Sequence, residues 1–146
     1  MLGVVGRETG RVRLEVVEHS SRAELEPRVV ASTAPAAAVN TDEWKAYGRL
    51  PESGRAHATV CHDPKRPGGP EYARDDDGDG VREVHCNTME GTWSGLRNFL
   101  RTFRGVHKKY LGQYVAMFEW ACNLARASTD FLRAMLGLKP STYRGT

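Results

Sequence analysis

The chain has 146 residues, of which 40% are hydrophobic, and it carries a formal net charge of +3. This length predicts one ordinary domain, and the apolar content is enough for a packed core, which excludes a disordered chain. The N-terminus lacks the basic and apolar regions of a signal peptide, and no apolar run approaches the roughly 18 residues of a membrane span. The three cysteines, odd in number and irregular in spacing, argue against a disulfide framework and for a reducing compartment. We therefore expect a soluble, intracellular protein.

The sequence pI of about 8.9 permits a nucleic-acid partner without requiring one. The cations are unevenly placed, because the segment from residue 97 onward holds only Glu119 and Asp130 as acids. Its basic residues are Arg97, Arg101, Arg104, Lys108, Lys109, Arg126, Arg133, Lys139 and Arg144. This part of the chain should attract a polyanion.

Two short strands are predicted at the N-terminus. Residues 2–5 are apolar, residues 11–18 alternate between polar and apolar, and Gly10 between them indicates a hairpin. Ser20 or Ser21 with Glu24 then resembles a capping box, which predicts the start of a helix. Leu25, Val29 and Val30 form the apolar face of that helix, and Pro27 must lie in its first turn or kink it.

The middle of the chain alternates between strands and short helices. Residues 36–42 predict a short buried strand that ends in Asp42, and residues 43–50 predict a short helix with Trp44 and Tyr47 on one face. Residues 55–62 predict another strand, and the residues from 64 to 79, rich in Pro, Gly and Asp, predict a loop.

Two long helices follow. Apolar residues recur at helical spacing over residues 88–104, with Asn87 or Thr88 as the N-cap. A second helix is predicted over residues 108–127, with Leu111, Val115, Phe118 and Cys122 on one face. Mixed strands followed by helices predict an α/β fold in which one sheet is covered by helices.

Asp42 and Glu90 are the two candidate site residues. Asp42 follows a strand, and functional groups in α/β sheets gather at such carboxyl ends, although an N-cap for the next helix is the alternative. Glu90 lies in the first turn of a predicted helix, where the helix dipole already favours a carboxylate. Arg97 lies seven residues further along and therefore shares a helix face with Glu90. A carboxylate that holds metal, with a cation for the phosphate backbone nearby, suits phosphodiester cleavage.

Several separated motifs resemble the ISXO-type insertion-sequence transposases. They are Asn-Thr-Asp-Glu-Trp-Lys-Ala-Tyr at 40–47, the segment 57–62, His-x-Asn-Thr-x-Glu-Gly-x-Trp-Ser at 85–94, Lys-Tyr-Leu-Gly-Gln-Tyr-Val-Ala-Met-Phe at 109–118, and Asn123. The segment 10–25 fits the family as well, so the resemblance covers about residues 2–127.

This resemblance implies an RNase H-like mixed sheet flanked by helices, and a DDE-type site. Asp42 then matches the second acidic residue and Glu90 the third, with Asn87 as the alternative in the third catalytic role. The implied cofactor is a pair of Mg²⁺ (or Mn²⁺) ions held by Asp42 and Glu90. Arg97 stands where the family has Lys, which keeps the positive charge but changes the geometry of phosphate contact.

The first catalytic Asp of the family belongs on a strand before residues 2–5, and no acidic residue precedes Glu8. From this the resemblance implies that the first strand is missing, that residues 1–127 are the partial catalytic domain of a truncated transposase, and that residues 128–146 are a C-terminal tail. The metal site should then be impaired.

The implied partner is transposon-end DNA, with a homo-oligomer or a full-length transposase as a possible protein partner, in the cytoplasm at the nucleoid. Five cations are the predicted DNA contacts, or alternatively a solvated face: Arg97, Arg101, Arg104, Lys108 and Lys109.

Three further interpretations compete with this one. The chain could be a non-catalytic DNA-binding remnant. It could be a calcium-binding module built on residues 75–80, although position twelve of that loop is Cys86 instead of Glu. The pairs Cys61-His62 and His85-Cys86 invite zinc but lack the usual ligand spacing, and His62 and His85 could instead lie near the active site. The three tryptophans, Trp44, Trp93 and Trp120, are expected in the core, with base stacking as the alternative.

Overall fold

The structure, a computed structural model, describes residues 1–137, with side chains for residues 1–124, 133, 136 and 137. The elements in chain order are β1 (Leu2–Val5), β2 (Val12–Glu15), α1 (Arg22–Ser32), β3 (Ala38–Asp42), η1 (Lys45–Tyr47), η2 (Leu50–Ser53), β4 (Ala56–Val60), β5 (Ala73–Arg74), β6 (Val84–His85), α2 (Asn87–Arg101), η3 (Lys108–Tyr110) and α3 (Leu111–Met135). The mixed α/β class is confirmed. The strands within residues 1–137 form three two-stranded pairs, β1–β2, β3–β4 and β5–β6, so the RNase H-like sheet stays a prediction.

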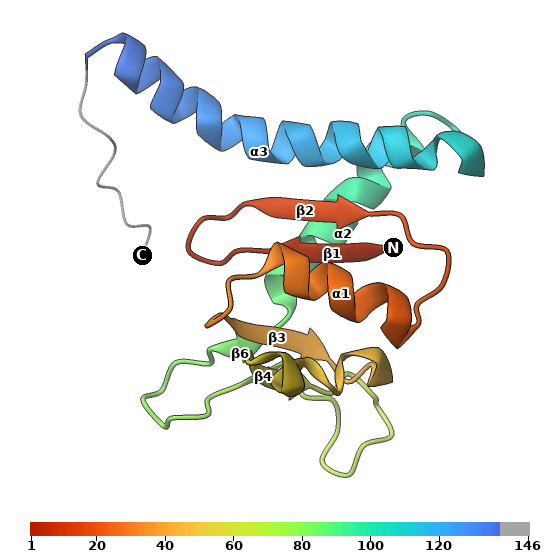
Figure 1. The fold of residues 1–146 in the computed structure, drawn as a ribbon, viewed down its shortest axis with the longest axis vertical. Helices are drawn as coiled ribbons and strands as arrows, with labels where there is room; N and C mark the ends of the chain where they lie inside the picture. Colours follow the sequence, from red (N-terminus) through yellow and green to blue (C-terminus); the bar gives the residue numbers. More distant parts are fainter. Residues whose placement is uncertain (138–146) are drawn as a thin grey trace.

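The predicted N-terminal hairpin is confirmed. β1 and β2 pair antiparallel, and Gly10 in the connecting turn has a φ of 61°, a conformation that glycine adopts without strain. Since side chains alternate along a strand, Leu2 packs against α1 while Gly3 lies against α2. The two helices therefore cover opposite faces of the hairpin (Figure 1).

Helix α1 begins where the capping-box pattern predicted. Ser21 is its N-cap but makes no side-chain cap bond, and the Glu24 carboxylate accepts a hydrogen bond from the backbone N–H of His19 at 3.3 Å. Pro27 lies inside the helix, on its exposed side, instead of in the first turn. Leu25 and Val29 are buried as expected, so the apolar face of this helix was predicted correctly.

Strands β3 and β4 run parallel, with Asp42 opposite Val60. The chain therefore leaves both strands at the same edge, which brings the segments after Asp42 and Val60 together. The predicted helix over residues 43–50 is wrong, because the chain forms the two short 3-10 turns η1 and η2 there. Pro51 disfavours the α conformation at Leu50, and Gly48 is a poor helix former, so a continuous helix is not stable in this segment.

Helices α2 and α3 pack with the hairpin in a second core. Its buried members are Val12, Leu14, Leu96 and Val115, and the predicted apolar face of α3 packs against them through Leu111, Phe118 and Cys122. α3 continues to Met135, beyond the predicted end at residue 127. Of the predicted tail, residues 138–146 lie outside the described residues, and so do Lys139 and Arg144. None of the helices in residues 1–137 combines the length and apolarity that a membrane span needs.

Side chains of α3 bind the outer edge of β2. The backbone N–H of Val12 donates to Oδ1 of Asn123 at 2.9 Å, and Nδ2 of Asn123 donates to the Val12 carbonyl at 2.9 Å. The N–H of Leu14 donates to Oε2 of Glu119 at 2.6 Å. These bonds replace the strand partner that an edge strand lacks.

Candidate active site

Asp42 lies at the carboxyl end of β3, on the surface. Its Oδ1 accepts a hydrogen bond from the backbone N–H of Trp44 at 3.1 Å, so one oxygen stabilises the turn that follows the strand. The N-cap of the next 3-10 turn is Trp44, which means that Asp42 caps no helix. Its second oxygen has no hydrogen-bond partner among the described residues and is available to a ligand.

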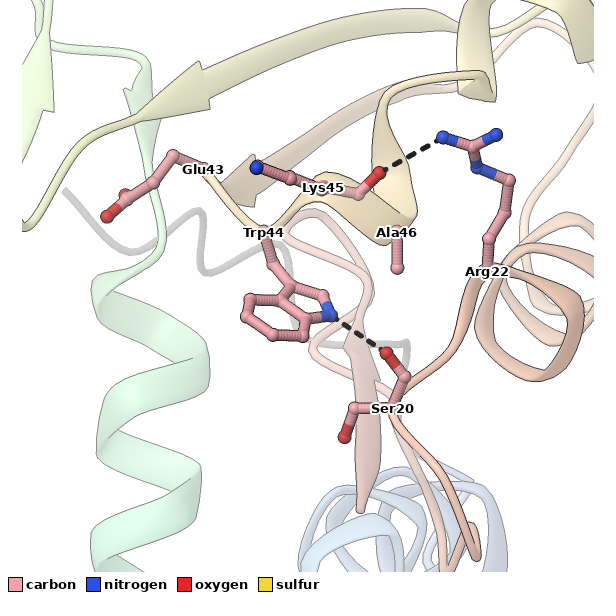
Figure 2. A pocket seen from close by; sticks show the side chains of 6 residues that line it. All are labelled: Ser20, Arg22, Glu43, Trp44, Lys45 and Ala46. Carbon is pink, nitrogen blue, oxygen red and sulfur yellow. Dashed lines mark hydrogen bonds between the residues drawn. The ribbon is translucent and has the colours of Figure 1, made fainter.

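Glu90 lies in the first turn of α2, and its carboxylate is exposed. Nδ1 of His62 lies 3.3 Å from Oε1 of Glu90. The backbone N–H of the same histidine donates to Oε2 of Glu43 at 3.0 Å. His62 therefore connects the segment after β3 with the start of α2, and Figure 2 shows the Glu43 side chain pointing toward that helix.

The pKa of the Cys86 thiol is raised, in part by the nearby acids. Burial and then the charges of Asp42 and Glu90 raise the pKa of Cys86 to about 11, while the charge of Arg7 opposes this shift. Burial and the charge of Asp42 likewise raise the pKa of Tyr47 to about 12. Both candidate carboxylates thus lie within electrostatic range of one thiol, where their negative potentials add.

Backbone amides stabilise the charged form of the nearby Glu43. Its own N–H and that of His62 donate to the carboxylate and lower the pKa of Glu43. An ionised carboxylate in this position adds to the negative potential that Asp42 and Glu90 create, which favours a cation.

The oxygen donors of Asp42 and Glu90 fit a hard divalent cation such as Mg²⁺ or Mn²⁺ in chemical type. Asp42 and Glu90 do not belong to a cluster of three possible metal-ligand atoms. Within residues 1–137, such a cluster is formed by Asp75, Asp77 and Glu83, whose ligand atoms lie within 4.8 Å of one another. The calcium hypothesis had not included Glu83. The available signal was that Glu83 lies within the same twelve-residue stretch, which ends at Cys86.

Most of the acids in the loop before β6 already have partners. Asp75 accepts from the N–H groups of Gly78 and Gly80 at 2.6 and 2.9 Å, and these bonds lower the pKa of Asp75. Asp77 accepts from the N–H of Asp79 at 3.1 Å. The carboxylates thus shape the turn themselves, as acidic side chains commonly do in loops.

The zinc hypothesis gains no support from the described residues. Cys61, His62, His85 and Cys86 do not assemble into a group of three ligand atoms. His62 instead contacts Glu90, which agrees with the alternative prediction that His62 lies near the candidate acids. His85 lies next to Arg7, whose guanidinium donates to the His85 carbonyl at 2.6 Å, and burial lowers the pKa of His85.

The sequence prediction missed Glu43 and Cys86 as neighbours of the candidate acids, and it named His62 only as an alternative, without its contact to Glu90. A signal was present for His62, because the ends of two parallel strands meet at one edge and His62 follows β4 just as Glu43 follows β3. Asn87, the alternative third residue, is exposed in the same first turn as Glu90.

The predicted DNA-contacting cations lie on α2 and on the connection to α3, and all five are exposed: Arg97, Arg101, Arg104, Lys108 and Lys109. Arg97 donates to the hydroxyl of Ser94 at 2.9 Å, and Arg101 to the side chain of Asn98 at 3.3 Å. None of the five forms an ion pair within the described residues. Glu90, Arg97 and Arg101 share one helix face, so the cations extend away from the acids along α2.

The tryptophans differ in their surroundings. Trp93 packs in the core against Leu96 and its neighbours, as predicted. Trp44 is 53% exposed and Trp120 is 65% exposed, so the prediction of core positions is wrong for these two. Trp44 precedes the short turn η1, Trp120 lies on α3, and neither belongs to the two core clusters of the described residues.

Comparison with protein families matched residues 1–123 to the ISXO2-like transposase domain. The match covers most of the chain. The protein belongs to the ISXO2-like transposase family. Comparison with curated proteins and with solved structures gave no match.

Membership of the ISXO2-like transposase family implies a transposase that binds the ends of a mobile element and uses a divalent metal. Asp42, Glu90 and the cations of α2 all lie within the matched range. Helix α2 thus carries one candidate metal ligand, Glu90, and the candidate phosphate contacts follow it along the same helix face.

Proposed function

We propose that this chain is a DDE-type transposase catalytic domain that cleaves DNA at insertion-sequence ends and transfers the cut strand. The observation that supports this most strongly is the convergence of the carboxyl end of β3 with the first turn of α2. His62 there contacts both Glu43, the residue after Asp42, and Glu90, and the unpaired cations of α2 begin two turns away.

Asp42 and Glu90 would hold the divalent ion. When bound, that ion supplies Lewis-acid activation of water or a 3′-hydroxyl and stabilises the leaving oxygen. Asp42 keeps one oxygen on its own turn and offers the other. His62 fixes the direction of the Glu90 carboxylate, and Asn87 is positioned to contribute an amide oxygen if it takes the third role.

The DNA backbone would follow the exposed side of α2. Arg97 is the cation nearest the acids along the helix and would contact a phosphate close to the reacting one. Arg101, Arg104, Lys108 and Lys109 would contact phosphates further along. Because none of them has a carboxylate partner in the described part of the chain, phosphate binding breaks no ion pair.

The RNase H-like arrangement belongs to the same proposal. In it, the antiparallel β1–β2 pair and the parallel β3–β4 pair are parts of one mixed sheet. One core cluster supports this, because Leu2 of β1, Leu25 of α1 and Leu50 of η2 pack together and Val39 of β3 packs against them. A single helix thus lies against both strand pairs.

A Mn²⁺ titration combined with DNA cleavage tests the function. The purified chain is titrated with Mn²⁺ and then incubated with a labelled duplex that carries the element's inverted repeats. We expect Mn²⁺ binding that Asp42→Ala and Glu90→Ala each remove while leaving DNA binding in place. Cleavage, which the family resemblance expects to be impaired in this chain, should depend on the same two residues.

The same titration separates the competing functions. DNA binding that requires no metal, with no cleavage under any condition, would identify a non-catalytic remnant. Metal binding that is lost in Asp77→Ala but kept in Asp42→Ala would identify the acidic loop as the metal site. Asn87→Ala distinguishes the two candidates for the third catalytic role.

A further inference from the structure

Trp44 lies two residues after Asp42 in an open, shallow pocket of about 660 Å³. Ser20, Arg22, Glu43, Lys45 and Ala46 complete the lining of this pocket. The indole N–H of Trp44 donates to the Ser20 carbonyl at 2.9 Å, which satisfies the one polar group of the ring (Figure 2). The ring is thereby held in one direction although 53% of the residue is exposed.

The position of this ring is linked to the candidate catalytic acid. The backbone N–H of Trp44 donates to Oδ1 of Asp42 at 3.1 Å, so the acid and the aromatic ring belong to one hydrogen-bonded turn. A large apolar ring that remains exposed contributes little to the core. The fixed orientation of this exposed ring beside Asp42 therefore favours a role in binding a ligand.

The pocket around Trp44 is basic. Arg22 makes only a long hydrogen bond to the Lys45 carbonyl, at 3.5 Å, and neither cation forms an ion pair within the described residues. The one acid of the pocket, Glu43, points away from the ring toward α2 (Figure 2). A flat aromatic face with two cations beside it matches a nucleotide, because the ring stacks on the base and the cations contact the phosphate.

We infer that Trp44, with Arg22 and Lys45, forms a subsite for one unpaired nucleotide of the DNA end, next to the phosphate on which Asp42 acts. The inference rests on the proposed function, since it assumes a DNA substrate. Trp44 stacks on an exposed base, which a fully paired duplex does not present. The subsite therefore favours DNA ends with an unpaired terminal base.

Fluorescence of 2-aminopurine tests this inference. The base analogue is placed at an unpaired end of a duplex, and the whole chain is titrated in Ca²⁺ at fixed salt, so that cleavage does not interfere. Stacking on Trp44 quenches the fluorescence. Trp44→Ala should remove the quenching and weaken binding by about 5- to 100-fold, as expected for one base–aromatic stack, and Trp44→Phe should keep most of both.

Trp120→Ala is the matched control, because Trp120 is a similarly exposed tryptophan on α3. It should keep the wild-type quenching and affinity, and circular dichroism establishes that each variant is folded. Normal quenching by Trp44→Ala, or an equal loss in Trp120→Ala, overturns the subsite while DNA binding by the wild type leaves the proposed function standing. A wild type that binds no DNA overturns both.

Discussion

Arg55 is 8% exposed, and its guanidinium has no carboxylate partner within the described residues. It instead donates to four oxygens at the end of α1 and in the following turns: the carbonyls of Val30, Thr33 and Ser53 and the hydroxyl of Thr33, at 2.8 to 3.0 Å. A cation in this position satisfies helix carbonyls that have no partner in the helix and offsets the negative end of the helix dipole. Arg55 thus stabilises the helix that lies against both strand pairs.

Replacing Arg55 with methionine should lower the free energy of unfolding by roughly 2–4 kcal/mol, because several buried carbonyls lose their donor. Urea unfolding followed by circular dichroism measures this change. Arg49→Met is the control, since the Arg49–Glu52 pair is exposed on both sides and contributes less than about 1 kcal/mol. Equal effects of the two substitutions would contradict the capping role of Arg55.

Tyr47 should make stability depend on pH in the alkaline range. Burial and then the charge of Asp42 raise its pKa in the folded state from 10.0 to about 12. The folded state therefore holds the phenolic proton more tightly than the unfolded state, and this contribution is complete below pH 10 and lost as the pH rises toward 12. Urea midpoints measured between pH 9 and pH 11.5 should fall less steeply for Tyr47→Phe than for the wild type. Parallel pH profiles would show that Tyr47 does not contribute.

At the scale of elements, β1 packs against α2 at a position where only glycine fits. A Cβ atom on Gly3 would lie 2.6 Å from Cε of Met89 and 2.7 Å from Cζ2 of Trp93, which is closer than such atoms approach. Gly3→Ala should therefore destabilise the fold by about 1–3 kcal/mol, because the neighbouring side chains must move. Chemical denaturation measures it.

Gly91→Ala, on the helix α2 that Gly3 packs against, provides the opposite case. A Cβ atom there meets nothing within 4 Å, and alanine is the better helix former by up to about 1 kcal/mol. This variant should be neutral or more stable than the wild type. If Gly3→Ala were equally harmless, β1 would not lie against α2 as closely as the structure indicates.

Sequence patterns predicted the elements well where one periodicity dominates. The alternation in residues 11–18 and the helical spacing after residue 88 both correspond to observed elements, β2 and α2. The pattern was weaker where glycine and proline interrupt it, as in residues 43–50, which form turns instead of a helix. The end of α3 was also missed, because no strong stop signal follows Ala127 until Gly137.

At the scale of the whole molecule, five ion-paired arginines contrast with the five cations of α2 and the connection after it. Arg13, Arg28, Arg49, Arg66 and Arg74 form ion pairs with acids of the chain. The five cations of α2 and the connection after it form none in the described residues. A formal charge of only +3 therefore includes a run of five cations along α2 and the connection after it that no acid of the described residues pairs with.

The unpaired cations should set the salt dependence of DNA binding. Replacing Arg101 and Arg104 with alanine should reduce the slope of log K against log salt by about 1.8, because each phosphate contact contributes about 0.9. Fluorescence anisotropy at several salt concentrations measures the slope. The control is Arg49→Ala with Arg66→Ala, which also removes two charges but from existing ion pairs. A slope that changes equally in both variants would argue against a specific DNA path along α2.

The candidate site could be predicted only in part from the sequence. Asp42 and Glu90 were found from their places at a strand end and in a first helical turn, together with the family motifs around them. The contacts of His62 with Glu43 and Glu90 were not predicted, because they depend on the parallel pairing of β3 with β4, which no local pattern reveals. The exposure of Trp44 likewise depends on which residues fill the core, and helical spacing alone does not decide that.

The hydrogen bonds between α3 and β2 allow the packing of α3 on the strand to be measured at two backbone amides of β2, which lie about a hundred residues away in the sequence. The N–H groups of Val12 and Leu14 donate to side chains of α3, so water reaches these amides only when the helix separates from the strand. Their hydrogen–deuterium exchange should therefore report the free energy of α3 detachment, separately from global unfolding. A DNA ligand that holds α3 in place would slow exchange at both amides together.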